Sequence, residues 1–397
     1  MKDYQTDSKL KKQRVIVLSL ALIPFSMVLG NSMLIPELPT LAQALGVSQV
    51  KISLLISFFS LSGGISIPIL GYLSDKYNRK TILLYSLLLY GSGGIIVGLL
   101  ALFTPQNYAA ILTARILQGL GAGGTYPLAI ALVGDIFQIH RRKKVLGLLE
   151  AANAGGKVLS PFLGALVALF FWPGLFFVYP LFTFPLAFTI YYLIPNQSSK
   201  AKKIKFSTYL TQITSLLYQN SSKFLVYLTT STVVLFISFG LLSYLSELLP
   251  TTYQIYGLKK AALLAVPIIT MVITAFWMGT YLKKNNPPPN YLLSGGLLIN
   301  ALSLLILPFL DGLVLYLVLI ACLGIGNGIV LTVLNTIFTN SSPNYRGGLT
   351  SIYSSMRFIG IALGPPSFAL LNQINSFTMF IIPALMALLL SLCNLFI

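Results

Sequence analysis

The sequence predicts an all-α integral membrane protein with twelve transmembrane helices in two pseudo-symmetric six-helix halves. Three observations lead to this prediction. Of the 397 residues, 56% are hydrophobic and 9% are charged, with a mean hydropathy of +0.85, whereas a soluble domain carries about 25% charged residues. The apolar residues form twelve runs of about the length, roughly 20 residues, that a helix needs to cross a bilayer. A basic, polar stretch separates the first six runs from the last six.

The twelve predicted spans follow one another with short polar breaks. Asp311 is the main break between spans 9 and 10, and residues 372–375 separate spans 11 and 12. Internal prolines are acceptable because transmembrane helices tolerate them. The first run is too long for a signal peptide and lacks a small-residue cleavage pattern, so we expect it to be retained. The spans are 15–36, 50–72, 81–103, 107–134, 145–168, 173–194, 224–248, 259–282, 289–310, 312–338, 347–371 and 375–397.

The basic residues predict the orientation. With a cytoplasmic N-terminus, 20 of the 26 Lys and Arg residues face the cytoplasm, as the basic bias of cytoplasmic loops requires. The net charge of +18 is therefore mainly a topology signal, and we expect no nucleic-acid partner. The prediction is a multi-pass protein of the cell membrane with both termini in the cytoplasm. The six exceptions are Lys51, Lys259 and Lys260 outside, and Arg115, Lys157 and Arg357 within spans.

The predicted organisation is a tail at 1–14, a first half at 15–195, a linker at 196–223 and a second half at 224–397. Residues 206–218 of the linker have the pattern of a short interfacial amphipathic helix. A weak internal repeat relates the halves, because three glycines of span 4 recur in span 10: Gly119, Gly121 and Gly123 match Gly324, Gly326 and Gly328. Duplicated halves are a plan of secondary transporters, which bind substrate between them. Glycine-rich apolar helices also resemble each other by composition alone.

The turn between spans 2 and 3 reads Gly71-Tyr-Leu-Ser-Asp75-Lys-Tyr-Asn-Arg79-Lys80. It resembles the G-x-L-x-D-r-x-G-R-K signature of the major facilitator superfamily, with asparagine at position 78 where the family usually has glycine. The resemblance implies that Gly71 allows close helix packing and that Asp75 helps to latch the two halves together. It also implies an ion pair between Arg79 and Asp135 at the cytoplasmic end of span 4.

Span 4 contains Arg115-Ile-Leu-Gln118-Gly119, which is similar to the family's second signature, R-x-x-q-G. An arginine about 10 Å inside the membrane is costly and marks a functional site by default. Asn31 of span 1 should lie at similar depth and accept a hydrogen bond from the guanidinium, whereas Glu37 is within reach only if both side chains extend. Two roles stay open for Arg115: a structural tie between spans 4 and 1, and a part in proton coupling with Glu37.

Span 5 reads Gly147-x8-Gly156-Lys157-x2-Ser160-Pro161-x2-Gly164-Ala165. It resembles the G-x8-G-x3-G-P-x2-G-G signature of the superfamily's exporters, with serine and alanine replacing two glycines. Together with the Pro36-Glu37-Leu38-Pro39 segment after span 1, this indicates the twelve-helix drug:proton antiporter group. Small residues allow close helix approach, and we expect those of span 5 at the seam between the halves.

Lys157 lies about twelve residues, roughly 18 Å, into span 5, and Arg357 lies at similar depth in span 11. No acidic side chain is expected near these two cations. Three explanations stay open. A substrate anion supplies the countercharge, burial keeps Lys157 neutral when the site is empty, or the cations bond backbone carbonyls beside helix kinks. We expect a central cavity that includes Lys157, Arg357, Asn31 and Tyr126.

The leading hypothesis for function is proton-coupled export of a hydrophobic or amphiphilic drug or metabolite by alternating access, with Glu37, Arg115 or Lys157 in proton coupling. The alternative is an exporter or flippase for an anionic amphiphile or lipid bound by Lys157 and Arg357. An integral-membrane enzyme ranks lowest, because the single histidine, His140, has no nucleophile or metal-ligand cluster around it in the sequence. We expect a monomer in the lipid bilayer that acts on a small molecule and protons, with no cofactor and no metal.

Overall fold

The computed structural model describes residues 2–195, 221–285, 287–310, 312–340 and 346–397, and within these ranges the regular structure is entirely helical. The proposed amphipathic segment 206–218 lies outside the described residues. The first half contains α1 (Lys2–Ser32), η1 (Ile35–Glu37), α2 (Leu38–Leu45), α3 (Gln49–Lys76), α4 (Arg79–Phe103), α5 (Tyr108–Ile136), α6 (Ile139–Phe170) and α7 (Gly174–Leu193). The second contains α9 (Ser221–Tyr253), α10 (Gly257–Asn285), α11 (Pro289–Ile306), η2 (Leu307–Phe309), α12 (Leu313–Asn340), α13 (Arg346–Ile374) and α14 (Ser376–Leu395).

Each of the twelve predicted spans corresponds to one long helix. Within the described ranges, eleven segments are long and apolar enough to cross a membrane. The helix of span 11, α13, is outside this set although it is 29 residues long. It carries Arg357 near its middle and packs mainly against α9 and α3. A helix that is enclosed between two others needs less apolar surface than one that faces lipid.

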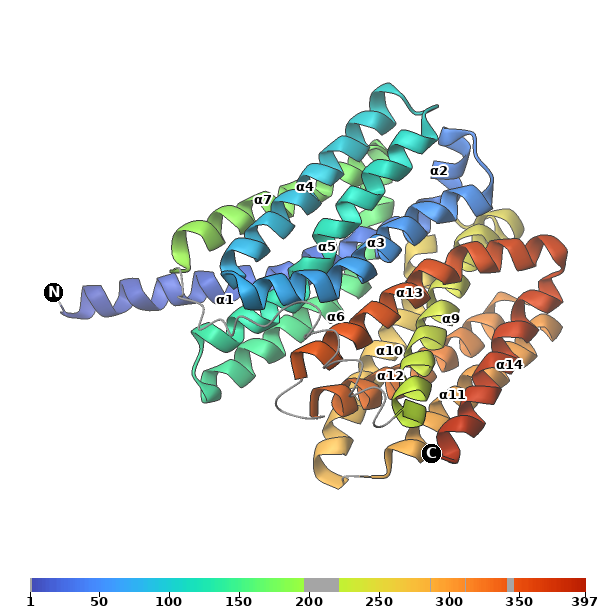
Figure 1. The fold of residues 1–397 in the computed structure, drawn as a ribbon. Helices are drawn as coiled ribbons and strands as arrows, with labels where there is room; N and C mark the ends of the chain where they lie inside the picture. Colours follow the sequence, from blue (N-terminus) through green and yellow to red (C-terminus); the bar gives the residue numbers. More distant parts are fainter. Residues whose placement is uncertain (1, 196–220, 286, 311, 341–345) are drawn as a thin grey trace.

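The two halves lie side by side in Figure 1, with the helices from α1 to α7 in blue and green and those from α9 to α14 in yellow and red. They meet along two main helix pairs, α3 with α13 and α6 with α10. At the first pair, the Ser355 hydroxyl donates to the Gly64 carbonyl at 2.6 Å, and Phe358 packs against Gly63 and Gly64. These helices form the seam between the halves.

The glycine repeat corresponds to equivalent packing in the two halves. A Cβ atom at Gly119 or Gly123 would meet backbone oxygens of α3, and one at Gly121 would meet the backbone of α4. In the second half, Gly324 and Gly328 approach α10 in the same way, and Gly326 approaches α11. The equivalent glycines of α5 and α12 therefore contact equivalent helices in the two halves. Composition alone would not produce this correspondence.

The expected location of the small residues of span 5 is wrong. Helix α6 does lie at the seam, but its motif glycines face α1 of the same half. A Cβ atom would lie 2.1 Å from the Met33 carbonyl oxygen at Gly164 and 3.2 Å from the Phe25 carbonyl oxygen at Gly156, whereas Gly147 has open space around it. Pro161 lies within the same helix. The motif thus allows close packing of α6 on α1, and other residues of α6 are left to face the partner half.

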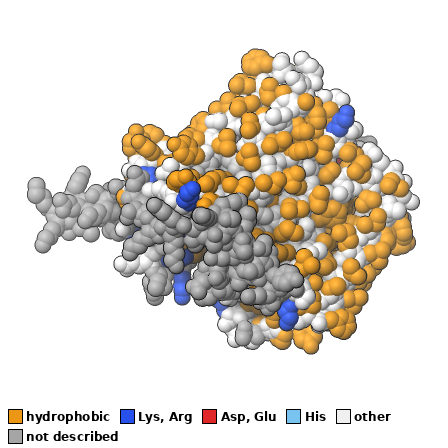
Figure 2. Space-filling view, in the orientation of Figure 1, with side chains coloured by type: hydrophobic (Ala, Val, Ile, Leu, Met, Phe, Trp, Pro, Cys, Tyr) orange, Lys and Arg blue, Asp and Glu red, His pale blue; other side chains and the backbone are white. Residues whose placement is uncertain are grey.

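The outer surface is that of a lipid-embedded protein. Figure 2 shows a face that is mostly hydrophobic, with Lys and Arg at a few scattered positions. Many large apolar side chains are exposed, including Tyr85, Phe170, Leu181, Phe276 and Trp277. An apolar surface this extensive exceeds the patches that soluble monomers tolerate. The protein is therefore a multi-pass membrane protein.

Candidate transport site and charged turn

Two cations from opposite halves meet at the seam. Lys157 lies near the middle of α6 and Arg357 lies in α13. The two side chains are close enough to interact electrostatically. Both side chains are partly exposed. Within the described residues, neither forms an ion pair or a hydrogen bond, and the Nε atom of Arg357 is buried without a partner. Both cations thus have donors available for an external group.

An acidic residue lies in the same cluster, contrary to our expectation. Glu150 interacts electrostatically with Lys157 and accepts a hydrogen bond from the hydroxyl of Tyr126 in α5. Its carboxylate therefore reduces the positive charge of the cluster without using the donors of either cation. The sequence did contain a signal for it, because residues seven positions apart lie on the same face of a helix.

The ring of Tyr353 lies against the Arg357 guanidinium. Its central carbon lies 5.4 Å from the centroid of the Tyr353 ring, and Tyr353 stacks on Phe338 of α12 with 4.7 Å between ring centroids. Such contacts hold a guanidinium in place and leave its edge free for bidentate binding. We call Lys157, Arg357, Glu150, Tyr126 and Tyr353 the seam cluster.

Arg115 of α5 is fully enclosed and is hydrogen-bonded in the first half. Its Nη2 atom donates to the Gly30 carbonyl at 3.0 Å and to Asn31 Oδ1 at 3.1 Å, so the expected bond to Asn31 is present. Nη1 donates to Gln118 at 2.6 Å, and Nε donates to the Leu55 carbonyl at 3.2 Å. Helices α1, α3 and α5 are joined in this way. The contacts favour the structural role of Arg115.

Asn31 is engaged by this network rather than by the seam cluster. While its Oδ1 atom accepts from Arg115, its Nδ2 atom donates to Ser60 of α3 at 2.6 Å. Both polar atoms are thus satisfied, and the side chain is buried. The structure therefore does not place Asn31 with Lys157 and Arg357, as our expectation of a common cavity required.

Glu37 lies at the other end of the bundle from the N-terminus, in η1 beside α2 (Figure 1). It is 8% exposed and accepts one hydrogen bond, from Thr40 at 3.0 Å. It makes no contact with Arg115; its charged neighbour is Lys260 of α10, which is itself 5% exposed. No direct ion pair joins these two described side chains, so a carboxylate and an ammonium from opposite halves are buried near each other.

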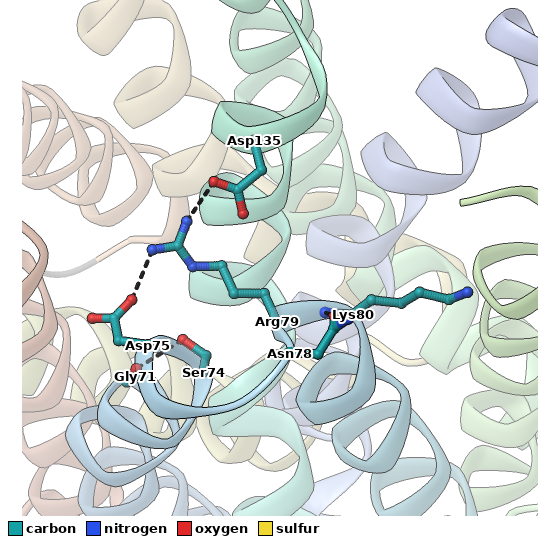
Figure 3. Close-up of polar contacts among 7 residues, drawn as sticks. All are labelled: Gly71, Ser74, Asp75, Asn78, Arg79, Lys80 and Asp135. Atoms are coloured by element: carbon teal, nitrogen blue, oxygen red, sulfur yellow. Dashed lines mark hydrogen bonds and ion pairs between the residues drawn. The ribbon is translucent and has the colours of Figure 1, made fainter. Parts of the chain in front are cut away.

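The charged turn between α3 and α4 contains the expected ion pair (Figure 3). Arg79 donates to Asp135 of α5 and to Asp75 of α3, both at 2.7 Å. These bonds join three helices of the first half and do not themselves cross the seam, so the expected latch between the halves stays a prediction. The turn approaches the second half at Gly71, where an added Cβ would lie 3.4 Å from Ser351 Oγ of α13.

Lys80 of the same turn points away from this network (Figure 3). Its ammonium donates to the carbonyls of Tyr191 and Ile194, at 2.8 and 2.6 Å. These are among the last carbonyls of α7, which lack partners within the helix. A cation at this position also interacts favourably with the helix dipole. Lys80, the last residue of the signature segment, therefore caps the C-terminal end of α7.

The architecture is that of a membrane transporter with two six-helix halves, and a cluster of charged and polar side chains lies between them. A family model for the Major Facilitator Superfamily matches residues 20–365 and 290–397. The chain therefore belongs to this superfamily, which confirms the resemblance seen in its motifs. Its function is transport and not catalysis. Among the described residues, no group of three or more His, Cys, Asp or Glu side chains is placed to hold a metal ion.

Similar proteins include exporters. The bacillibactin exporter of Bacillus subtilis (strain 168) is 34% identical over 371 residues, covering 93% of this chain and 92% of the relative. The quinolone resistance protein NorA of Staphylococcus aureus (strain MRSA252) is 23% identical over 350 residues, covering 85% of each chain. Among solved structures, a bacterial homolog of the human lysosomal transporter Spinster has a TM-score of 0.77 and 16% identity, covering 97% of this chain and 96% of its own. The human organic anion transporter MFSD10 has a TM-score of 0.73 and 19% identity, covering 96% and 99%.

Proposed function

We propose that the protein is a proton-coupled exporter of an amphiphilic small molecule whose negative charge binds Lys157 and Arg357. The observation that carries the proposal is the unpaired state of these two cations at the seam. Charged groups inside a membrane protein are costly and mark substrate pathways. The relative with 34% identity, which is named as an exporter, supports the direction of transport.

The position of the two cations on opposite sides of the seam suggests how the export cycle works. A substrate that touches both Lys157 and Arg357 contacts both halves, so binding favours arrangements in which the halves close around it. We assign the end with the charged turn to the cytoplasm, because Lys76, Arg79, Lys80 and residues 141–144 form a basic group there. This assignment places the N-terminus inside the cell. Because one chain supplies both sides of the site, a monomer in the cell membrane is sufficient.

Glu37 is the residue to which we assign proton coupling. An anion beside Lys157 stabilises the ammonium, so substrate binding does not release a proton from that group. Antiport needs a different group whose surroundings change as the halves move. Glu37 is buried against the second half, near Lys260, and would be hydrated when that end opens. Its carboxylate can therefore gain or lose a proton during the cycle.

Flux in proteoliposomes tests this function. With a fluorescent monocarboxylate amphiphile inside and an imposed proton gradient, we expect wild-type efflux to rise with the gradient, whereas a lipophilic cation should move little. Glu37→Gln should still bind the anion but lose the dependence on the gradient. Glu247→Gln, which alters another partly buried acid, is the matched control. Cation efflux without anion efflux would overturn the substrate assignment, and gradient-driven efflux by Glu37→Gln would overturn the role of Glu37.

The charged turn is proposed to control the conformational change as a latch. The side chains of Asp75 and Arg79 are 55% and 31% exposed, and exposed ion pairs contribute only about 0–1 kcal/mol to stability. Asp75→Asn should therefore insert and fold normally but reduce export at least tenfold. Thermal unfolding and flux should be measured together on the same preparation. Wild-type flux would contradict the latch, whereas loss of folding would make the turn a structural element.

A further inference from the structure

The charges of the seam cluster do not balance. Lys157 and Arg357 supply two positive charges, and Glu150 supplies one negative charge. Among the charged groups of the described residues, Arg357 and Glu150 are the ones that act on Lys157. With all three groups ionised, the cluster has a net charge of +1. A ligand with one negative charge would therefore bring the cluster to neutrality.

Glu150 is held away from the donors that a ligand would use. Its carboxylate accepts from the Tyr126 hydroxyl and forms no ion pair with Lys157 or Arg357 in the described structure. Arg357 keeps a buried Nε without a partner, and its ring contact with Tyr353 leaves the guanidinium edge free. The donors are thus available for a ligand while a fixed negative charge remains nearby. An acid that merely neutralised the cations would instead be expected to bond them directly.

We propose that Glu150 is the charge-selectivity residue of the transport site, limiting it to amphiphiles with a single carboxylate-type head group. This inference rests on the proposed function. A planar carboxylate matches the guanidinium fork of Arg357, and Lys157 provides a second point of attraction from the other half. A second negative charge on the ligand would meet Glu150 without a remaining cation to offset it. Dianions are therefore disfavoured by the same cluster that attracts monoanions.

The expected size of the effect follows from Coulomb's law. Because Glu150 is exposed, solvent screens its charge; two unit charges about 6 Å apart at an effective dielectric constant of about 40 interact by about 1.4 kcal/mol, which is a factor of about ten in binding. Removing the charge of Glu150 should improve binding of a dianion by about tenfold more than binding of a monoanion, because the dianion has the additional charge. The quantity to measure is the ratio of the two dissociation constants. Because Glu150 is exposed, Glu150→Gln should not disturb folding.

The test uses the purified full-length protein in nanodiscs and two fluorescent probes, a dansylated fatty monocarboxylate and a dicarboxylate of the same chain length. Wild type should bind the monocarboxylate more tightly. In Glu150→Gln the preference should shift toward the dicarboxylate by about tenfold, whereas Glu247→Gln should keep the wild-type ratio. Glu247 is a suitable control because it is an acid of α9 outside the seam cluster.

The outcomes separate the two proposals. An unchanged ratio in Glu150→Gln, with monocarboxylate binding intact in wild type, would overturn the selectivity role and leave the proposed function standing. An equal shift in Glu247→Gln would show a general effect of net charge and would also overturn it. If wild type binds neither probe, the anion site itself is wrong, and the selectivity role falls with it.

Discussion

Lys157→Met is expected to weaken binding of the anionic amphiphile by roughly thirtyfold, which corresponds to about 2 kcal/mol, the lower limit for removing one partner of a buried charge pair. Methionine keeps the length and apolar character of the side chain and removes only the ammonium. Export should fall with binding, because the ligand loses its contact with the first half. The measurements are the dissociation constant in nanodiscs and the efflux rate in proteoliposomes.

Lys157→Arg is the matched control, since it retains the charge at the same position of α6. It should keep most of the affinity, whereas Lys157→Met should not. Unchanged binding and flux in the methionine variant would show that Lys157 does not contact substrate. The explanation left from the sequence would then be a lysine that burial keeps neutral when the site is empty, because no described backbone carbonyl accepts a hydrogen bond from its ammonium.

Arg115→Met is expected to destabilise the protein by about 3–5 kcal/mol, because each buried acceptor that loses its donor costs roughly 1–3 kcal/mol and the packing of the guanidinium is lost as well. The guanidinium donates to acceptors on α1, α3 and α5. The substitution leaves the side-chain oxygens of Asn31 and Gln118 without their donor, whereas the Gly30 carbonyl still accepts from the Tyr179 hydroxyl. The cation also lies over the Phe59 ring, 4.3 Å from its centroid. Thermal unfolding and the yield of monodisperse protein measure the loss.

This substitution also decides between the two roles that the sequence left open for Arg115. A structural tie predicts loss of stability with Arg115→Met and partial retention with Arg115→Lys, because lysine keeps the charge but has fewer donors. A role in proton coupling predicts a stable Arg115→Met protein whose export no longer depends on the proton gradient. The second result would contradict the structural role that the contacts favour.

Local sequence patterns were sufficient to predict the features that the surrounding lipid determines. The twelve apolar runs predicted the twelve long helices, because a segment in lipid must satisfy its backbone hydrogen bonds internally. The bond between Arg115 and Asn31 was also predictable, since depth follows directly from helical rise. The Arg79–Asp135 pair came from a motif whose spacing and position in the chain are both specific.

The sequence did not predict which neighbouring helix a given side chain contacts, because this depends on how each helix is rotated about its axis. In a membrane, the faces toward lipid and toward other helices are both apolar, so hydrophobicity does not show which face packs where. For this reason the glycines of α6 were expected at the seam but pack on α1. Glu150 was missed for a different reason: it lies two turns nearer the end assigned to the cytoplasm than Lys157, and its position on the same face of α6 was not weighed.

Composition and chain order thus determined that the protein spans a membrane with twelve helices in two related halves. The tertiary structure decided which charges meet. It placed Lys157, Arg357 and Glu150 in one cluster and buried Glu37 near Lys260. Arg357 and Lys260 are far along the chain from the first-half residues that they approach, and only the packing of whole helices against one another brings these charges close enough to interact.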